Sequence, residues 1–323
     1  MGKLRYTDVK SKEREFLALT GLTVDEFESL IPEFEKTFQA HMAEWRFDGQ
    51  RRTKRKYTTY QNSPLPTAED RLLFVLLYLK GNPLQAHHGV MFGMMQGKAN
   101  RWLYLLMPLF QKTLRTLGVA PSRTLEELAQ RGDIVERQEA AQTPEADVPL
   151  PLFVMTPPKD GLSAPKVRRN RRLAIVAKKT HTLKSLLLIN RSMMILLLSD
   201  TCAGSIHDKR LADAYLYPLP AGSWLLQDLG FLGFSLANTE ILTPFKKPRG
   251  NPLSLAQKSF NRQLSSLRVR IEHVISSVKR CRIIKDPCRL RGIPVQDMLM
   301  EIACALHNFR LYMSPWLPLV KSK

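Results

Sequence analysis

The stretch from Trp224 to Arg282 constrains this chain more than any other. It opens with a short apolar run that ends in the carboxylate of Asp228 and the turn residue Gly230. It closes with a segment whose apolar residues recur at steps of three and four, which predicts an amphipathic helix. These apolar residues are Leu264, Leu267, Ile271, Val274, Ile275 and Val278. Glu272 falls at the edge of that apolar face, one turn after Arg268.

A carboxylate at a strand end and another on a packed helix, 44 positions apart (272 − 228), can converge on one divalent metal site. Hard cations such as Mg²⁺ prefer carboxylate oxygens and keep open positions for water, and paired metals of this kind drive phosphodiester cleavage. The alternative is structural: an Asp after a strand is commonly a turn residue, and a Glu beside an Arg on a helix commonly forms a solvated ion pair. Spacing alone leaves both interpretations open.

The balance of charge indicates a polyanionic partner. The 323 residues carry 49 Lys and Arg against 29 Asp and Glu, a formal net charge of +20. Such an excess favours nucleic acid, because neutralised phosphates release counterions; a ribosome-like or membrane-surface protein is the alternative. No run of 18 apolar residues and no apolar leader occur, so neither a membrane span nor secretion is expected. Four cysteines without zinc-ligand spacing fit a reducing compartment.

The N-terminal third of the chain predicts helices. Thr23 and Glu26 form a capping box at the start of one helix, and Thr67 with Asp70 repeats the pattern at the start of another. Between these two helices lies a basic stretch, Arg51 to Tyr57, which is either a solvated linker or a phosphate contact.

A short helix from Leu84 to Phe92, a turn at Gly93 and a longer helix from Gln96 to Leu114 form the pattern of a helix-turn-helix. The second helix would present polar residues to the major groove of DNA. These are Gln96, Lys98, Asn100 and Arg101. The alternative is an ordinary helical hairpin.

The periodicity changes after a connector that holds one candidate helix, Leu125 to Glu139. A short strand is expected over 151–155, and a buried hairpin over 186–198. Together with the strand that ends at Asp228 and the helix that carries Glu272, these predict a sheet flanked by helices. A further helix is expected over 295–311.

Several motifs in this order resemble the bacterial insertion-sequence DDE transposases related to the Harbinger type. The segment 65–85 resembles their helix-turn-helix domain. Further matches are Lys179 to Lys184, Gly204 to Lys209, Gln227 to Phe231, Arg268 with Ile271-Glu272, and Leu306 to Arg310. The resemblance covers roughly residues 20–312 and implies an α/β, RNase H-like mixed sheet flanked by helices, preceded by an all-α helix-turn-helix domain.

The resemblance implies metal-dependent strand cleavage and strand transfer at terminal inverted repeats, with two Mg²⁺ (or Mn²⁺) ions. By match, Asp228 and Glu272 are the second and third catalytic and metal-binding carboxylates, and Arg268 and Lys279 are candidate phosphate contacts. Asp208 either orients groups around the metal ligands or caps the helix that follows it; the cap is favoured.

The first carboxylate is where this chain departs from the family. The family has an Asp-x-Thr-Glu-Arg segment at the end of its first strand, but this chain reads Met155-Thr156-Pro157-Pro158. In the neighbouring reading frame, the last base of the Met155 codon and the first two of the Thr156 codon must spell GAC, an Asp codon. Allowed codon choices continue the family motif until Lys178-Lys179. The hypothesis is a frame shift near Met155 with a compensating one near Lys179, with Asp160 as a weak substitute ligand.

Two functions are therefore expected. The first is a DDE transposase that cuts DNA, and the second is a non-catalytic relic or repressor that only binds it. The expected organisation is a helical region (1–50), a basic linker (51–66), the helix-turn-helix domain (67–118), a connector (119–149) and the catalytic domain (150–323). The expected partners are double-stranded DNA, as terminal repeats and target, and a second copy of the chain. A cytoplasmic, nucleoid-associated location without membrane contact is expected.

Overall fold

The structure, a computed structural model, describes residues 3–53, 56–59, 62–131, 152–156, 183–215, 217–227, 229–247, 252–290 and 292–316. The chain divides into two compact units. Unit 1 comprises Met1–Ala120 and Val278–Met313, and unit 2 comprises Pro121–Ser277 and Ser314–Lys323. Each unit is described by itself.

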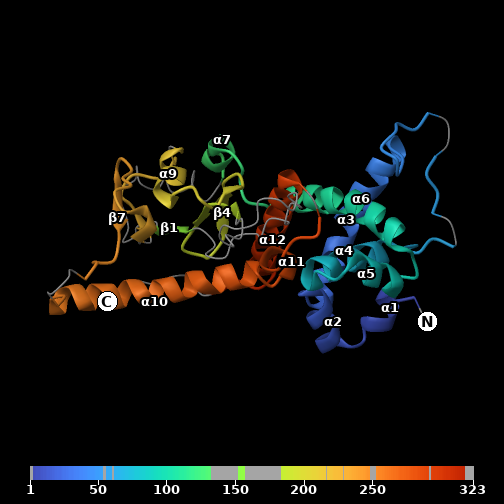
Figure 1. The fold of residues 1–323 in the computed structure, drawn as a ribbon, viewed down its shortest axis with the longest axis horizontal. Helices are drawn as coiled ribbons and strands as arrows, with labels where there is room; N and C mark the ends of the chain where they lie inside the picture. The colour runs from blue at the N-terminus through green and yellow to red at the C-terminus, as the bar shows by residue number, and fades with distance from the viewer. Residues whose placement is uncertain are drawn as a thin grey trace, which may run out of the picture. The chain divides into compact units, whose positions relative to one another are not determined.

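Unit 1 is helical (Figure 1). Its helices are α1 (Tyr6–Val9), α2 (Glu13–Thr20), α3 (Val24–Glu44), α4 (Ala68–Gly81), α5 (Gln85–Met91), α6 (Gln96–Thr116), α11 (Arg282–Lys285) and α12 (Ile293–Met313). Among the described helices of either unit, none has the length and apolarity that a membrane span requires.

Capping side chains fix where α3 and α4 begin. The Thr23 hydroxyl accepts from the Glu26 amide, and the Glu26 carboxylate accepts from the Thr23 amide at 2.8 Å, which confirms the predicted capping box. Thr67 likewise accepts from the Asp70 amide at 3.1 Å. The Asp70 carboxylate instead accepts from the Tyr6 amide at 2.9 Å, so it anchors the N-terminal segment to α4.

The central helix of unit 1 is α4, whose residues from Asp70 to Leu79 are all buried. A helix that is apolar around its whole circumference lies inside a domain, and α4 is packed by α2, α3, α6 and α11. It also buries Arg71, whose guanidinium donates to Glu35 and lies 4.1 Å from the centre of the Phe38 ring. The buried charge is therefore paired and covered.

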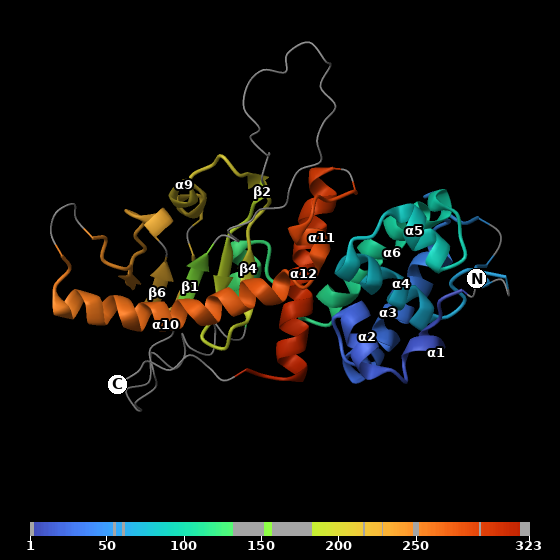
Figure 2. The same ribbon diagram turned by 60° about the horizontal axis from the view of Figure 1, so that its bottom comes forward.

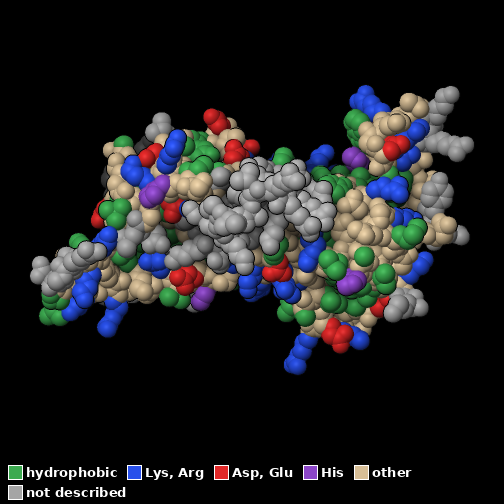
Figure 3. Space-filling model, in the orientation of Figure 1, with side chains coloured by type: hydrophobic (Ala, Val, Ile, Leu, Met, Phe, Trp, Pro, Cys, Tyr) green, Lys and Arg blue, Asp and Glu red, His purple; other side chains and the backbone are tan. Residues whose placement is uncertain are grey.

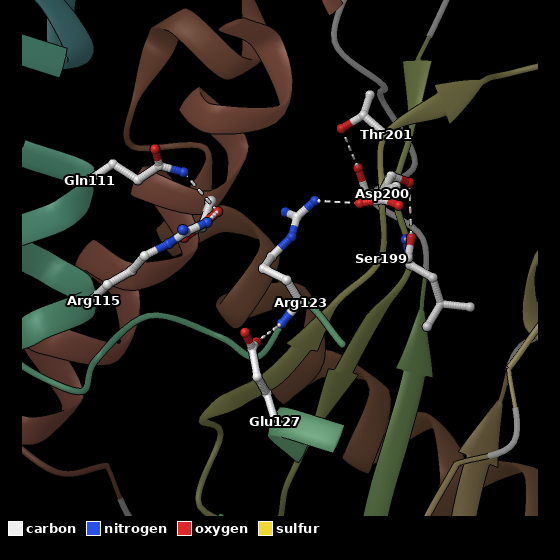
Figure 4. A network of polar contacts seen from close by, with 10 residues as sticks. Gln111, Arg115, Arg123, Glu127, Ser199, Asp200 and Thr201 are labelled. Atoms are coloured by element: carbon white, nitrogen blue, oxygen red, sulfur yellow. Dashed lines mark hydrogen bonds and ion pairs between the residues drawn. The ribbon is translucent and has the colours of Figure 1, made fainter. Parts of the chain in front are cut away.

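The C-terminal helix α12 is attached to α6 by a buried carboxylate. Glu301 is 1% exposed, and it accepts from Arg115 Nη2 at 2.7 Å and from Gln111 Nε2 at 2.8 Å. Arg115 Nε donates to the other carboxylate oxygen, so the guanidinium binds in the bidentate geometry (Figure 4).

Unit 2 is built on a five-stranded mixed sheet of order β4-β3-β1-β6-β7. Its strands are β1 (Leu152–Thr156), β3 (Leu187–Ile189), β4 (Ile195–Leu198), β6 (Ser223–Gln227) and β7 (Thr239–Leu242), and a small second sheet pairs β2 (Leu183–Lys184) with β5 (Cys202–Ala203). β1 is antiparallel to β3 and parallel to β6, which is parallel to β7.

Helices lie on both sides of this sheet. One side packs against α7 (Leu125–Ala129), α9 (Asp208–Asp213) and the 3₁₀ turn η1 (Leu229–Phe231), through a cluster that includes Phe153, Met155 and Leu225. The long helix α10 (Leu255–Val278) runs along the opposite side (Figures 1 and 2). Its buried apolar residues are Leu264, Ile271, Val274 and Val278, and Leu267 and Ile275 are half-buried, which agrees with the predicted apolar stripe. The result is a three-layer α/β unit.

Two predicted boundaries were wrong. The helix expected over Leu125–Glu139 ends at Ala129 as far as the described residues show, and Gly132 in the sequence is a residue that favours helix termination. In the β3–β4 hairpin, Met193 belongs to the turn, with a φ of 68°, and the strand begins at Ile195. A hydrogen bond from the Met194 amide to the Asn190 side chain at 2.9 Å closes this longer turn.

Arg115→Ala should destabilise unit 1 by about 2–3 kcal/mol, because it removes the bidentate guanidinium from the buried Glu301 carboxylate and leaves its hydrogen bond with Gln111 in place. The loss is at the lower end of the range for buried pairs because Arg115 itself is half-exposed. Urea unfolding of the whole chain measures it. Lys36→Ala, which removes the exposed pair with Glu33 on α3, is the matched control and should cost about 0.5 kcal/mol or less. Equal losses for the two variants would contradict the prediction.

Candidate functional site

The carboxyl ends of β1 and β6 meet at one edge of the sheet, because the two strands are parallel neighbours. Their register pairs Met155 with Gln227, the last residue of β6. Gln227 is 2% exposed, so β6 is buried up to its end. The strand that the sequence predicts before Asp228 is therefore present, although Asp228 itself lies outside the described residues.

β1 carries no acidic residue at this edge of the sheet. Its residues, from Leu152 to Thr156, are apolar up to Met155, and Thr156 is half-buried at the end. Side chains alternate along a strand, so Thr156 lies on the same side of β1 as Val154 and opposite to Met155, which belongs to the α9 side. Thr156 therefore lies on the side where α10 runs. Asp160, the predicted substitute, lies outside the described residues.

Glu272 lies on α10 and its side chain is exposed. The preceding residue, Ile271, is 4% exposed, so Glu272 directly follows the buried stripe of the helix. Arg268, one turn earlier, is half-buried on the same helix, and Lys279 follows the last residue of α10. A carboxylate at this place can bind a cation from solvent. No group of three His, Cys, Asp or Glu side chains able to hold a metal occurs among the described residues.

Asp208 is not the cap that the sequence favours. The N-cap of α9 is His207, whose ring nitrogen accepts from the Lys209 amide, and Asp208 is the first residue of the helix. Its carboxylate accepts from Lys184 Nζ at 2.9 Å and approaches the backbone of Gly230 so closely that a Cβ there would lie 2.6 Å from Asp208 Oδ2. The Lys184–Asp208 pair thus packs against the turn that follows Asp228. The sequence prediction missed this contact because the partner lies 24 positions away.

The predicted helix-turn-helix consists of α5, a turn at Gly93 with a φ of 67°, and α6. The two helices approach closely at Gly89, where a Cβ would lie 2.6 Å from the Met94 carbonyl oxygen. The buried His88 ring contacts the Phe74 carbonyl oxygen at 3.1 Å, and burial lowers the pKa of His88 to about 4. His88 is therefore a neutral core residue rather than a ligand.

The four polar residues predicted to contact DNA fall on the first turns of α6 but differ in their surroundings. Gln96, Lys98 and Arg101 are exposed, whereas Asn100 donates to Gln85 of α5 at 3.0 Å. Asn100 therefore helps to hold the two helices of the motif together. Gln96 is the first residue of α6.

Lys98 and Arg101 also line a cavity of about 720 Å³ between α6 and the segment that follows α3. Arg52, Lys56 and Tyr57 of the predicted basic linker line its other side. Figure 3 shows Lys and Arg side chains on the surface formed by the end of α3 and the segment after it. The linker is therefore ordered against the motif where it is described, and the sequence alone did not predict that the two meet.

Comparison with known proteins gives two family matches. Residues 164–308 match the family described as "DDE superfamily endonuclease", and residues 63–116 match "Helix-turn-helix of DDE superfamily endonuclease". The endonuclease match begins after the end of β1. The "Probable transposase for insertion sequence element IS702" of Microchaete diplosiphon is 24% identical over 223 residues, covering 69% of this chain and 74% of that protein. No solved structure matches the chain.

These matches agree with the fold. Apart from β1 and α7, which precede it, the mixed sheet and its helices lie within the endonuclease match, and this is the RNase H-like arrangement that such a domain implies. The helix-turn-helix match coincides with α4, α5 and α6. The predicted fold class is thus confirmed. The chain therefore belongs to the DDE endonuclease superfamily and carries the helix-turn-helix domain of that superfamily.

Proposed function

We propose that this chain binds the terminal inverted repeats of its element through the helix-turn-helix and does not cut them, because its first catalytic carboxylate is missing. The observation that carries the proposal is the end of β1, where Met155 and Thr156 stand beside Gln227. A first-strand carboxylate would have to lie at this edge to meet Asp228. Without this carboxylate, the metal site of the family lacks one of its three carboxylate ligands.

The register of the sheet supports this interpretation. Thr156 is the residue of β1 next after the Met155–Gln227 pair, just as Asp228 is next after Gln227 in the sequence. It lies on the side of the sheet along which α10, with Glu272, runs. This is the position where the frame-shift hypothesis independently locates the lost Asp codon. The endonuclease family match starts eight positions later (164 − 156).

The donor set does not fit the metal site that the family implies. DDE endonucleases generally use divalent metal ions. Here Asp228 and Glu272 remain as candidate ligands, and the described part of β1 contributes none. Two carboxylates in place of three give the metal ions fewer charged ligands, so Mg²⁺ or Mn²⁺ should bind weakly.

DNA binding is supported by unit 1. α6 carries Lys98 and Arg101 exposed on its first turns, and the packed α4 and α5 hold this helix in place. The net charge of +20 favours association with duplex DNA irrespective of its sequence. Specificity for a terminal repeat would come from side chains that reach base edges, for which exposed Gln96 is the leading candidate.

Lys98→Ala should weaken binding to every duplex and reduce the salt slope of log K by about 1, because one phosphate contact is lost. Gln96→Ala should instead weaken binding to the terminal repeat about fivefold or more while binding to unrelated duplexes changes little. Fluorescence anisotropy across a salt series distinguishes these effects. Lys112→Ala, an exposed lysine near the other end of α6, is the charge-matched control. Equal affinity of the parent chain for repeat and unrelated DNA would remove the proposed specificity.

The parent chain should not cleave terminal-repeat DNA in the presence of Mg²⁺ or Mn²⁺, whereas a chain whose reading frame is restored across codons 153–180 should cleave it. Thr156→Asp in the parent chain adds a carboxylate at the end of β1 without changing the rest of the segment, and it should also allow cleavage. In both altered chains Asp228→Asn should abolish the cleavage, which a gel assay with labelled repeat DNA measures.

The proposal would be overturned if the parent chain cuts the repeat and loses this activity in Asp228→Asn. If that activity is also lost in Asp160→Asn, the 156–179 segment is a genuine variant and Asp160 is its first ligand. Sequencing the gene across codons 153–180 decides between a shifted frame and such a variant before any protein is made.

A further inference from the structure

The cavity between α6 and the linker combines cations with aromatic rings. Its described lining includes four cationic side chains, Arg52, Lys56, Lys98 and Arg101, and none of its lining residues is acidic. Three aromatic rings, Phe47, Tyr57 and Trp102, lie among them. A major-groove helix needs no such pocket, because base edges are read on an intact duplex.

The cationic and aromatic residues of α6 reach the cavity together because they share one face of the helix. Lys98, Arg101 and Trp102 stand at positions i, i+3 and i+4. Trp102 is 4% exposed and is packed edge-on by Phe47, with ring centroids 4.5 Å apart. The aromatic wall is therefore part of the fold of unit 1.

The opposite wall is held by the linker. Arg52 Nε donates to the Met42 carbonyl at 2.6 Å and to the Trp45 carbonyl at 3.0 Å, which fixes this arginine at the end of α3. The Arg52 guanidinium lies 5.5 Å from the centre of the Tyr57 ring, and Phe38 contacts the same ring edge-on. Tyr57 is thus oriented from two sides. Phe47, which is 38% exposed, presents a ring that a ligand can reach.

The geometry points to a pocket for one nucleotide of DNA, with its base unstacked from the duplex. The cationic side chains can pair with the phosphate, and the aromatic rings can stack on any of the four bases. The side chain of Asn62 in the lining can form hydrogen bonds with base edges. The volume of about 720 Å³ lies within the range of roughly 300–1,000 Å³ that small-molecule sites occupy. This inference rests on the proposed DNA binding and adds a second mode of contact beside the major groove.

The test compares two duplexes that carry the same sequence, one fully paired and one with a single unpaired 2-aminopurine. The full-length chain should bind the duplex with the unpaired base about fivefold or more tightly than the paired duplex. The fluorescence of the 2-aminopurine should be quenched when it stacks on the aromatic rings. Phe47→Leu keeps the apolar packing but removes a ring, and Tyr57→Ala removes another. Both should lose the preference for the unpaired base and keep their affinity for the paired duplex. Tyr57→Phe should retain the preference.

Tyr312→Ala, an exposed tyrosine on α12 outside the cavity lining, is the control and should behave as the parent chain. Equal binding of the two duplexes by the parent chain would overturn the nucleotide pocket while leaving the proposed DNA binding intact. Loss of affinity for both duplexes to the same extent in Phe47→Leu would also overturn it, since the residue would then contact only the backbone. If the chain binds free deoxyadenosine monophosphate but does not prefer the duplex with the unpaired base, the pocket binds a free nucleotide. That result would contradict the proposal that its ligand is a nucleotide within DNA. Failure to bind any DNA would instead reject the proposed function itself.

Discussion

The parallel register between β1 and β6 determines where chemistry can occur in unit 2. β1 lies in the middle of the sheet, bonded on one side to β3 and on the other to β6, and it is buried from Leu152 to Met155. Parallel strands bring their carboxyl ends to one edge, and Met155 and Gln227 are paired there. The turn after β6 is held from one side by the Lys184–Asp208 pair, and α10 runs along the other side of the sheet.

In unit 1, one helix, α6, contributes both to the hydrophobic core and to the surface proposed to bind DNA. The inward face of α6 buries Leu103, Leu106 and Phe110, while the first turns expose Lys98 and Arg101. The exposed residues therefore stand on a helix that packing against α3, α4 and α12 keeps in place. A surface supported in this way loses little side-chain and loop entropy on binding, which favours affinity.

Local signals predicted the helices well, since caps and periodicity are encoded within a few residues. α3, α4 and α6 begin where Thr23, Thr67 and the turn at Gly93 indicate. Long-range pairings were not predictable: Arg115 meets Glu301 186 positions away, and Asp208 meets Lys184 rather than capping its own helix. The cavity also escaped prediction, because it needs the linker to fold back on α6. The roles of Asp228 and Glu272 came from resemblance to a family and stay predictions.

The point at which β1 stops being buried bears on the proposal that this copy does not cut DNA. β1 is buried as far as Met155 and pairs with β3 as far as Thr156, and the departure from the family begins at these two residues. In the proposed function, the buried part of β1 and the segment that would carry the first carboxylate are adjacent but separate, so a change of reading frame after Met155 would remove the carboxylate and leave the buried strand intact. If unit 1 still recognises the ends of the element, a silenced copy would occupy sites that its active relatives need. Each additional copy would then slow the spread of the whole lineage within the host genome.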